Sequence, residues 1–264
     1  MPEQLILIAF VQGITEFLPI SSSGHLNLLH GLGISDDHGL AMDVAVHLGT
    51  VIAVIAYNFS EIQRLVISFL TFGRYHDDVH GTSIAAFIAT IPVIIAGFLL
   101  NDSPVLLDLL RNVEVIAWAT LIFGILLGLA DRNVGRRRFR TIHMGDALVI
   151  GLAQCLALIP GTSRAGITMT AARAAGISPR AAARFSMILS IPVILGSGVL
   201  KGMDMMRDGT TALWADMILA GGVAMLVAFV SIHAMLAIIQ RVGFMPFVIY
   251  RIILGTGLLA IVYL

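Results

Sequence analysis

Residues 5–25 read LILIAFVQGITEFLPISSSGH. A short apolar run is interrupted by Glu16 and Pro19, and a tip of three serines, a glycine and a histidine follows it. A helix needs about 20 apolar residues to cross a bilayer core about 30 Å thick. This run is too short to cross, and proline and serine clusters end helices. The segment is therefore typical of a chain that enters a membrane and turns back inside it.

The composition agrees with a membrane location. Of the 264 residues, 58% are hydrophobic and 12% are charged, whereas a soluble domain carries about 25% charged residues. The formal net charge is zero, so no overall field favours nucleic acid as a partner. The single cysteine, Cys155, excludes an internal disulfide framework. The N-terminal residues lack a basic region and a cleavage signal, so we expect no removable signal peptide. These features indicate an all-α polytopic membrane protein.

The apolar segments predict about six transmembrane helices and two re-entrant helical hairpins. A second short apolar stretch, Ala147–Ile159, is stopped by PGTSR at residues 160–164, as the first is stopped by its serine tip. Each stretch leads into another short piece, His25–Gly33 or Ala165–Gly176. Irregular backbone at membrane depth survives only inside protein or along a wet cavity. The predicted crossings are Leu40–Phe59, Ser83–Leu100, Val115–Ala130, Phe185–Leu200, Met217–Gln240 and Val242–Leu264.

The order of elements repeats, since each half reads as a hairpin followed by three crossings. We therefore expect one integral membrane domain, 1–264, with inverted pseudo-repeats 1–130 and 141–264. The connecting loop 131–140 holds five arginines, which places it in the cytoplasm. The halves echo each other at a spacing of about 141 residues, which pairs Gln12 with Gln154, Ser22 with Ser163 and Asp43 with Arg184.

The two tips carry groups that suit phosphate. Serine and threonine stand where helix N-caps belong, and helix N-termini attract phosphate or carboxylate. Arg164 could clamp phosphate oxygens, and Gln12 and Glu16 share one helix face. A carboxylate, an imidazole, hydroxyls and an arginine can together run phosphoryl transfer, with His25 or Glu16 moving protons. The carboxylate could instead hold a divalent cation that bridges to phosphate.

Each of these features has a simpler interpretation. Serines before helices are usually caps alone, and the intramembrane histidines His47 and His233 are typical of hydrogen-bonded structural residues. Arg251 and Asp43 could pair with other charges in the bundle. The basic run 136–140 would serve as a topology anchor. Only the coincidence of two tips favours the functional interpretation.

At the same residues the sequence resembles the bacterial undecaprenyl-diphosphate phosphatases associated with bacitracin resistance. QGITEFLPISSSGH (12–25) is similar to the first motif of that family, and PGTSRAGIT (160–168) to the second. The likeness extends to VAVHLGTVIAV (44–54), RFSMILSIPV (184–193) and PFVIYR (246–251). The resemblance implies a hydrolase of the bacterial inner membrane. Such an enzyme removes the terminal phosphate of a C55 polyprenyl diphosphate, on the extracytoplasmic side. It would recycle the lipid carrier for peptidoglycan synthesis, and so support cell wall biogenesis, cell shape and antibiotic resistance.

The resemblance also implies roles for single residues. Glu16 is the acidic site residue, Ser22 a nucleophile, His25 the acid or base and Arg164 the phosphate clamp. A divalent cation, Mg2+ or Ca2+, is usual in the family, and Glu16 is its candidate ligand here. The substrate-binding residues would be Gln12, Ser21, Ser23, Thr162, Ser163 and Thr168.

This sequence departs from the family motifs at two positions. Gln12 replaces a glutamate, which weakens a magnesium site because one carboxylate is lost, and Ala165 replaces a serine beside the clamp. Two alternatives stay open. A transporter or lipid flippase would use the same inverted repeat and anion pocket, but would need no activated hydroxyl. The type 2 phosphatidic acid phosphatases share Ser-Gly-His and Ser-Arg elements, but their lysine-containing first motif is absent. The membrane lipids are expected partners, and a homodimer is left open.

Overall fold

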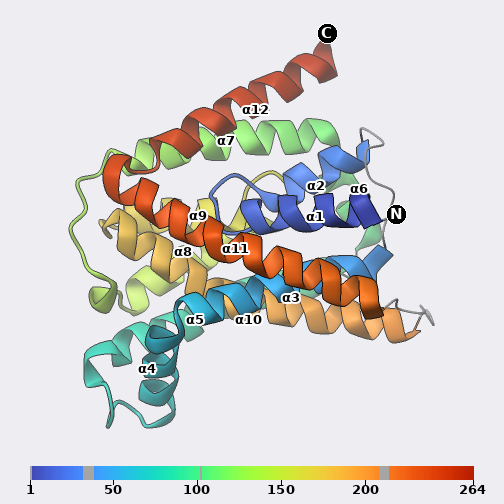
Figure 1. The fold of residues 1–264 in the computed structure, drawn as a ribbon. Coiled ribbons are helices and arrows are strands. Elements are labelled where there is room, and N and C mark those ends of the chain that lie inside the picture. Colours follow the sequence, from blue (N-terminus) through green and yellow to red (C-terminus); the bar gives the residue numbers. More distant parts are fainter. Residues whose placement is uncertain (1, 32–38, 102, 208–213) are drawn as a thin grey trace.

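The structure, a computed structural model, describes residues 2–31, 39–101, 103–207 and 214–264. Within those ranges the regular structure is helical, apart from one isolated bridge between Arg137 and Ile177 (Figure 1). The all-α fold class is therefore confirmed. The α-helices are α1 (Pro2–Thr15), α2 (Ser22–Gly31), α3 (Gly39–Tyr57), α4 (Phe59–Leu70), α5 (His80–Asn101), α6 (Pro104–Leu110), α7 (Val113–Asp131), α8 (Met144–Cys155), α9 (Arg164–Ala174), α10 (Pro179–Arg207), α11 (Trp214–Val242) and α12 (Met245–Tyr263).

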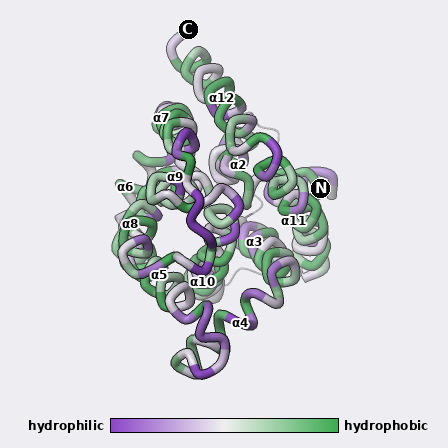
Figure 2. The backbone as a smooth tube through the Cα atoms, turned by 90° about the vertical axis from the view of Figure 1, so that its left-hand side faces the viewer, coloured by the Kyte–Doolittle hydropathy of each residue, from purple (hydrophilic) through white to green (hydrophobic). Residues whose placement is uncertain are grey.

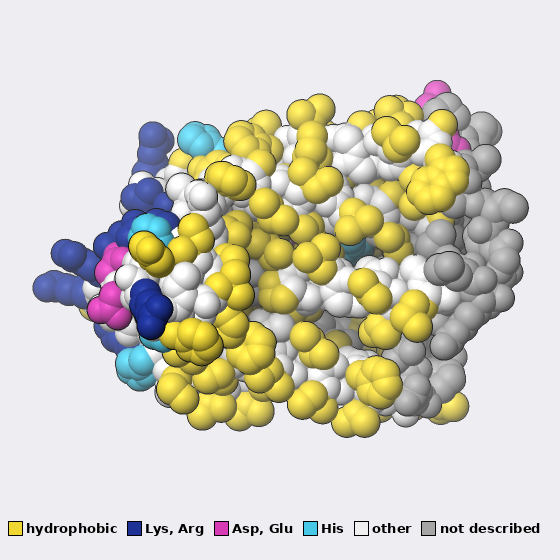
Figure 3. Space-filling view, turned by 90° about the horizontal axis from the view of Figure 1, so that it is seen from below, with side chains coloured by type: hydrophobic (Ala, Val, Ile, Leu, Met, Phe, Trp, Pro, Cys, Tyr) yellow, Lys and Arg dark blue, Asp and Glu magenta, His cyan; other side chains and the backbone are white. Residues whose placement is uncertain are grey.

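Five helices are long and apolar enough to cross a membrane, namely those containing Asp77–Leu100, Val113–Asp131, Pro179–Met203, Trp214–Val242 and Met245–Tyr263. The sixth predicted crossing, Leu40–Phe59, corresponds to α3, which qualifies as a span only together with α4, and the two helices are bent by 85° from one another. Asn58 lies at the bend and donates its side-chain N–H to the carbonyl of Val54. The protein is thus a multi-pass membrane protein, and its surface agrees. Figure 2 shows mostly hydrophobic helices, and Figure 3 shows hydrophobic side chains covering most of one face.

Helices α1, α3 and α5 of the first half correspond in order to α8, α10 and α11 of the second half. Several helix contacts in one half have a counterpart between the corresponding helices. Helix α1 packs on α11, as α8 packs on α5, and α3 packs on α11, as α10 packs on α5. Two further pairs, α3 with α10 and α7 with α12, map onto themselves. This pattern is the one that two inverted repeats produce. The pseudo-repeat boundaries 1–130 and 141–264 stay a prediction.

Both re-entrant pieces are present as short helices. Helix α1 and helix α2 form the first hairpin, and α8 and α9 the second. The predicted second piece of the first hairpin, His25–Gly33, begins earlier, at Ser22, and its last two residues lie outside the described ranges. In Figure 1, α1 starts near the end of the molecule that carries the N-terminus, whereas α8 follows the loop at the opposite end.

The arginine-rich loop is tied to the second hairpin by its own charges. Arg137 donates to both carboxylate oxygens of Asp146 in α8, at 2.7 and 2.6 Å. Arg173 in α9 donates to Asp131 at 3.1 Å. Bidentate arginine–carboxylate pairs fix orientation as well as distance. The basic side chains visible on the face drawn in Figure 3 gather at this end of the molecule.

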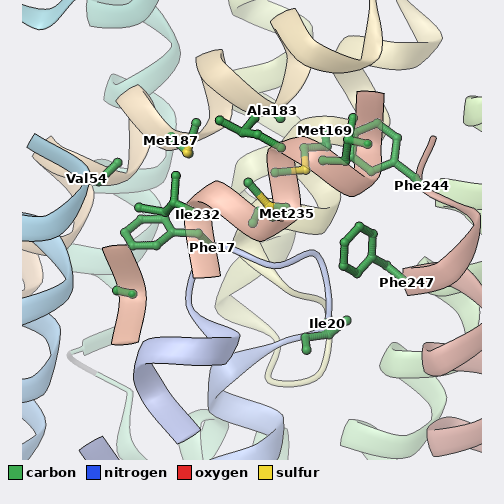
Figure 4. Close-up of a cluster of buried hydrophobic side chains, with 14 of the residues drawn as sticks. Phe17, Ile20, Val54, Met169, Ala183, Met187, Ile232, Met235, Phe244 and Phe247 are labelled. Carbon is green, nitrogen blue, oxygen red and sulfur yellow. The ribbon is translucent and has the colours of Figure 1, made fainter. Parts of the chain in front are cut away.

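A hydrophobic cluster holds the two hairpins against the long helices. Phe17 and Ile20 come from the turn between α1 and α2, and Met169 comes from α9. They pack with Met235 of α11 and Phe247 of α12, and all five side chains are buried (Figure 4). Interiors of this kind are packed as densely as organic crystals, so the side chains in them have little room to move. The cluster therefore fixes where each tip points.

Candidate active site

The tips of the two hairpins touch each other. We define tip 1 as residues 16–25 and tip 2 as residues 158–168. A Cβ atom placed on Gly24 would lie 3.7 Å from the Cα atom of Gly161. Gly161 has a φ of +92°, and a Cβ there would come within 2.4 Å of the carbonyl oxygen of Ile116 in α7. Only glycine accommodates both the conformation and the approach, so tip 2 can sit against α7.

Each tip turns into its second helix through a serine with positive φ. Ser21 has a φ of 77° and Ser163 a φ of 68°. The Oγ atom of Ser21 accepts the N–H of Gly24 at 3.2 Å, and that of Ser163 accepts the N–H of Gly166 at 3.1 Å. These are N-cap hydrogen bonds on a backbone conformation that costs about 1–3 kcal/mol for a non-glycine residue. Such outliers cluster at functional sites.

This geometry corrects the alignment of the two halves. Ser163 corresponds to Ser21 and not to Ser22, at a separation of 142 residues that also matches Gln12 with Gln154. The residue equivalent to Ser22 is therefore Arg164. Each of these two residues is the first of its helix, α2 or α9.

Glu16 joins the two tips. Its Oε2 atom accepts the hydroxyl of Ser22 at 2.7 Å and the side-chain N–H of Gln12 at 2.9 Å. Its Oε1 atom accepts the guanidinium of Arg164 at 3.3 Å. The Nε2 atom of His47 lies 4.0 Å from Oε2. Glu16 itself is 8% exposed. The predicted nucleophile, acidic residue and clamp thus share one small site.

Arg164 is held from behind by α10. Its Nη1 atom donates to the carbonyl of Ser186 at 3.2 Å, and its side chain is 12% exposed. Thr168, one turn along α9, donates to the hydroxyl of Ser186 at 2.7 Å and is buried. Thr168 therefore lies behind the clamp, where it fastens α9 to α10.

His25 faces away from Ser22. Its Nδ1 atom lies 2.6 Å from the carbonyl oxygen of Ser21, and its Nε2 atom lies 2.5 Å from the hydroxyl of Tyr250 in α12. The two rings stack with their centroids 5.7 Å apart. A ring nitrogen beside a carbonyl must carry the proton, so Nε2 accepts from Tyr250. The proton of Ser22 is directed to Glu16, and the acid–base role of His25 stays a prediction.

Arg251 ties both tips to α7. Its guanidinium donates to the carbonyls of Pro19 in tip 1 at 3.3 Å, and of Gly161 and Thr162 in tip 2, both at 2.9 Å. The remaining donors reach the carbonyls of Thr120 and Ala119, at 3.1 and 3.3 Å. All five N–H groups of a guanidinium are thereby used. The expected charge partner was wrong, because the partners found in the described ranges are backbone carbonyls.

A cavity of about 610 Å³ opens beside the tips. Ser23 of tip 1 and Pro160 of tip 2 line it, together with His47 of α3. Arg111, Lys201 and Asp43 also line it. Lys201 forms the expected intrabundle pair with Asp43, at 2.8 Å. With two basic residues and one acidic residue, the lining carries a net positive charge. Arg111 and Lys201 were not predicted as site residues, since neither stands in a motif.

The other predicted binding residues divide by exposure. Ser23 is exposed and its Oγ atom lies 3.3 Å from that of Ser21. Gln12, Ser21, Thr162 and Ser163 are buried beneath it. The Oε1 atom of Gln12 and the Oγ1 atom of Thr162 are buried with no hydrogen-bond partner. Buried polar atoms are normally paired, so these two atoms mark places where a ligand group or water belongs.

Among the residues that the structure describes, no three His, Cys, Asp or Glu side chains converge as a metal site. The oxygens available to a cation are the carboxylate of Glu16 and the amide of Gln12. An amide and a carboxylate are hard oxygen donors, and Mg2+ commonly takes one or two protein oxygens plus phosphate and water. The donor set fits a divalent cation that arrives with its phosphate.

Comparison with known proteins gives a consistent result. The model of the family described as Bacitracin resistance protein BacA matches residues 5–257. The undecaprenyl-diphosphatase of Hahella chejuensis is 44% identical over 263 residues, which is 98% of both chains. That of Alcanivorax borkumensis is 46% identical over 261 residues, or 97% of both chains. That of Roseobacter denitrificans is 44% identical over 262 residues, or 98% of both.

Proposed function

This chain belongs to the Bacitracin resistance protein BacA family, and on that premise we infer that it is an undecaprenyl-diphosphate phosphatase. It hydrolyses the terminal phosphate of a C55 polyprenyl diphosphate and so returns the lipid carrier to cell-wall synthesis, which underlies bacitracin resistance. The observation that carries the activity is the array of Ser22, Glu16 and Arg164 where the two tips meet. Fold by itself would not decide function.

In the proposed first step, Ser22 attacks the terminal phosphorus. Its Oγ atom forms the new P–O bond while Glu16, at 2.7 Å, takes the hydroxyl proton. That distance lies within the reach of a general base. The bond between the terminal phosphorus and the bridging oxygen breaks, and its electron pair leaves with the polyprenyl monophosphate.

In the second step, water attacks the phosphoserine. The bond from phosphorus to Oγ breaks, and the proton held by Glu16 returns to Ser22. The water proton leaves with inorganic phosphate, so both residues are restored. A direct attack by water on the diphosphate, with Glu16 as base, uses the same carboxylate and differs only in leaving Ser22 unmodified.

Arg164 and the two helix starts supply the charge stabilisation. The guanidinium stands at the first residue of α9, beside the N–H groups that an N-terminus leaves unpaired. Helix α2 presents a second such end at Ser22. Phosphoryl transfer depends almost entirely on positioning and on stabilising negative charge at the phosphoryl oxygens. The pocket concentrates positive potential at that point.

We also propose that a divalent cation assists the reaction. Glu16, with the amide oxygen of Gln12, would hold it. The cation would supply Lewis-acid stabilisation of phosphate charge.

The cavity supports an extracytoplasmic opening in the bacterial inner membrane. Arg111 follows α6, and Lys201 lies in the last two turns of α10, the end of that helix that is farther from the arginine-rich loop 131–140. If that loop is cytoplasmic, as the distribution of positive charge favours, the cavity mouth lies on the other side. Substrate would enter with its diphosphate in the cavity and its polyprenyl chain in the bilayer.

The transporter alternative is not favoured. A transport site needs an arginine and helix ends but no hydroxyl held by a carboxylate, and the relatives are named as phosphatases.

The decisive experiment is phosphate release from C55 polyprenyl diphosphate by the purified chain in detergent, with and without a chelator. Arg164→Ala should lower the rate about 100-fold or more, the usual loss for one charge-stabilising donor. Arg74→Ala, which removes an exposed arginine, should not change it.

Phosphate release that survives in Arg164→Ala would contradict the proposal. Release that stops with chelator in the unmodified chain supports the cation at Glu16. Release that persists with chelator would remove the cation and leave Arg164 and the helix ends as the stabilising groups.

A further inference from the structure

A second polar cavity lies at the start of α10, whereas the cavity beside the tips is lined by Lys201, near the end of that helix. It has a volume of about 430 Å³ and is lined by four arginines, Arg138, Arg140, Arg180 and Arg184, and by one acidic residue, Glu61. The first two arginines come from the loop after α7 and the others from the start of α10. The loop and the helix start are far apart in the sequence, so the fold brings these charges together.

Most of this positive charge has no carboxylate partner in the described part of the chain. Arg140 pairs with Asp78 at 2.6 Å. No salt bridge forms between Arg138, Arg180 or Arg184 and any carboxylate of the described ranges. Arginines presented together in this way are the usual recognition elements for phosphate. The cavity thus suits an anion carrying phosphate oxygens.

Glu61 indicates that a ligand in this cavity must also carry a hydrogen-bond donor. Its Oε1 atom is buried and has no hydrogen-bond partner. A carboxylate oxygen only accepts hydrogen bonds, and a buried acceptor without a donor costs free energy. A ligand that fits this cavity therefore carries a hydroxyl or other donor in addition to its phosphate.

An apolar hollow is lined by residues of the same two helices, α4 and α10, and by residues of α5. Its volume is about 230 Å³, and its lining includes Ile62, Leu65 and Phe69 of α4, Ala86 of α5, and Ile188 and Pro192 of α10. Glu61 and Ile62 are neighbours in α4, and Arg184 and Ile188 are one turn apart in α10, about 6 Å along the helix. Phe69 and the neighbouring Phe87 are exposed on the outer surface, where a membrane protein meets lipid.

We propose that these two cavities form one binding site for an anionic phospholipid with a hydroxyl-bearing headgroup, of the phosphatidylglycerol class. The phosphodiester lies among Arg138, Arg180 and Arg184, a headgroup hydroxyl donates to Glu61, and an acyl chain fills the apolar hollow. Basic pockets between helices at the cytoplasmic boundary are suited to lipid headgroups. A soluble anion would use the arginines but would have no need of the hollow.

The test is a binding titration of the purified full chain, stripped of lipid in detergent and followed by native mass spectrometry. Phosphatidylglycerol should bind, and phosphatidylcholine with the same chains should not compete with it. The double variant Arg180→Gln, Arg184→Gln should weaken phosphatidylglycerol binding about 30-fold, from about fivefold per arginine. The matched double variant Arg136→Gln, Arg241→Gln removes two exposed arginines outside the cavity and should bind as the unmodified chain does.

Two further arms test the parts of the site. Phosphatidylmethanol keeps the phosphodiester but lacks headgroup hydroxyls, so it should bind about fivefold more weakly. Ala86→Leu, which fills the hollow, should weaken a long-chain phosphatidylglycerol but not a dihexanoyl one. Equal binding by the two double variants, or equal binding of phosphatidylcholine, would overturn the proposal. Phosphate release by the arginine variants in detergent should be unchanged, so failure here is distinct from failure of the phosphatase assignment.

Discussion

The two tips enter their second helices through the same serine turn but carry different side chains. In each, a serine with positive φ caps the N–H of a glycine three residues later, and a short helix begins at the next residue. That next residue is Ser22 in tip 1 and Arg164 in tip 2. The two tips thus supply two equivalent helix ends that differ in their first residue, and we propose that one end carries the reacting hydroxyl and the other the charge clamp.

The helices that lead into the tips, α1 and α8, also carry equivalent residues with different hydrogen-bond partners. Gln12 and Gln154 are equivalent and both fully buried. Gln12 donates to Glu16, whereas Gln154 donates to the backbone carbonyl of Ala89 at 3.2 Å. The position equivalent to Glu16 in the second half is Leu158. In the proposed mechanism, proton transfer is therefore confined to tip 1, and tip 2 contributes charge stabilisation.

The largest expected loss of phosphate release is that of Ser22→Ala. Ser22→Ala removes the hydroxyl held by Glu16, and phosphate release should fall about 10⁴-fold or more, as when a serine nucleophile is deleted. Ser60→Ala, at an exposed position in α4, should keep the normal rate. A Ser22→Ala rate within about tenfold of normal would instead favour direct attack by water.

Glu16→Gln should have the next largest effect. The amide cannot take the proton from Ser22, so phosphate release should fall about 10²–10⁴-fold. Glu3→Gln, an exposed change in α1, the helix that leads to Glu16, is the matched control. Retention of activity in Glu16→Gln would move the base to another group, and His25 would be the first to test.

Arg251→Met tests whether one guanidinium joins the two tips. Five carbonyls lose their donor, so the free energy of unfolding should drop by about 3 kcal/mol or more. Thermal unfolding in detergent measures this change. Phosphate release should fall even at temperatures where the variant stays folded, because the tips lose their common anchor. A variant that is less stable but fully active would show that Arg251 only stabilises the fold.

The smallest effects compare the two caps directly. Ser21→Ala and Ser163→Ala each remove one N-cap hydrogen bond, which is worth about 1 kcal/mol. The two variants should therefore unfold at similar temperatures in a thermal melt. A large difference between them would mean that the two helix ends are not equivalent, and the comparison above would fail.

Much of this arrangement could be predicted from sequence. The short apolar runs stopped by PISSSGH and PGTSR predicted both hairpins, because length and turn residues are local signals. The off-by-one alignment of Ser22 with Ser163 arose because three consecutive serines fit either register. Only the backbone φ of Ser21 and Ser163 distinguishes the two. The end of α3 agrees with the predicted end of that crossing at Phe59, but α4 and its bend of 85° were not predicted.

Long-range contacts could not be predicted. Arg251 reaches carbonyls in tip 1 and tip 2 that are 232 and 90 residues away, and carbonyl acceptors leave no mark in a sequence. The stacking of His25 on Tyr250 joins residues 225 positions apart. The metal ligand at Glu16 and the homodimer stay predictions.

The central claim is that the two tips act on one phosphate, and a double-mutant cycle tests it most directly. Phosphate release would be measured for Glu16→Gln, Arg164→Gln and the double variant, under single-turnover conditions. Residues that act as one unit give non-additive losses, so the double variant should be about as slow as the slower single variant. A loss equal to the product of the two single losses would mean that the tips act independently, and would contradict the account.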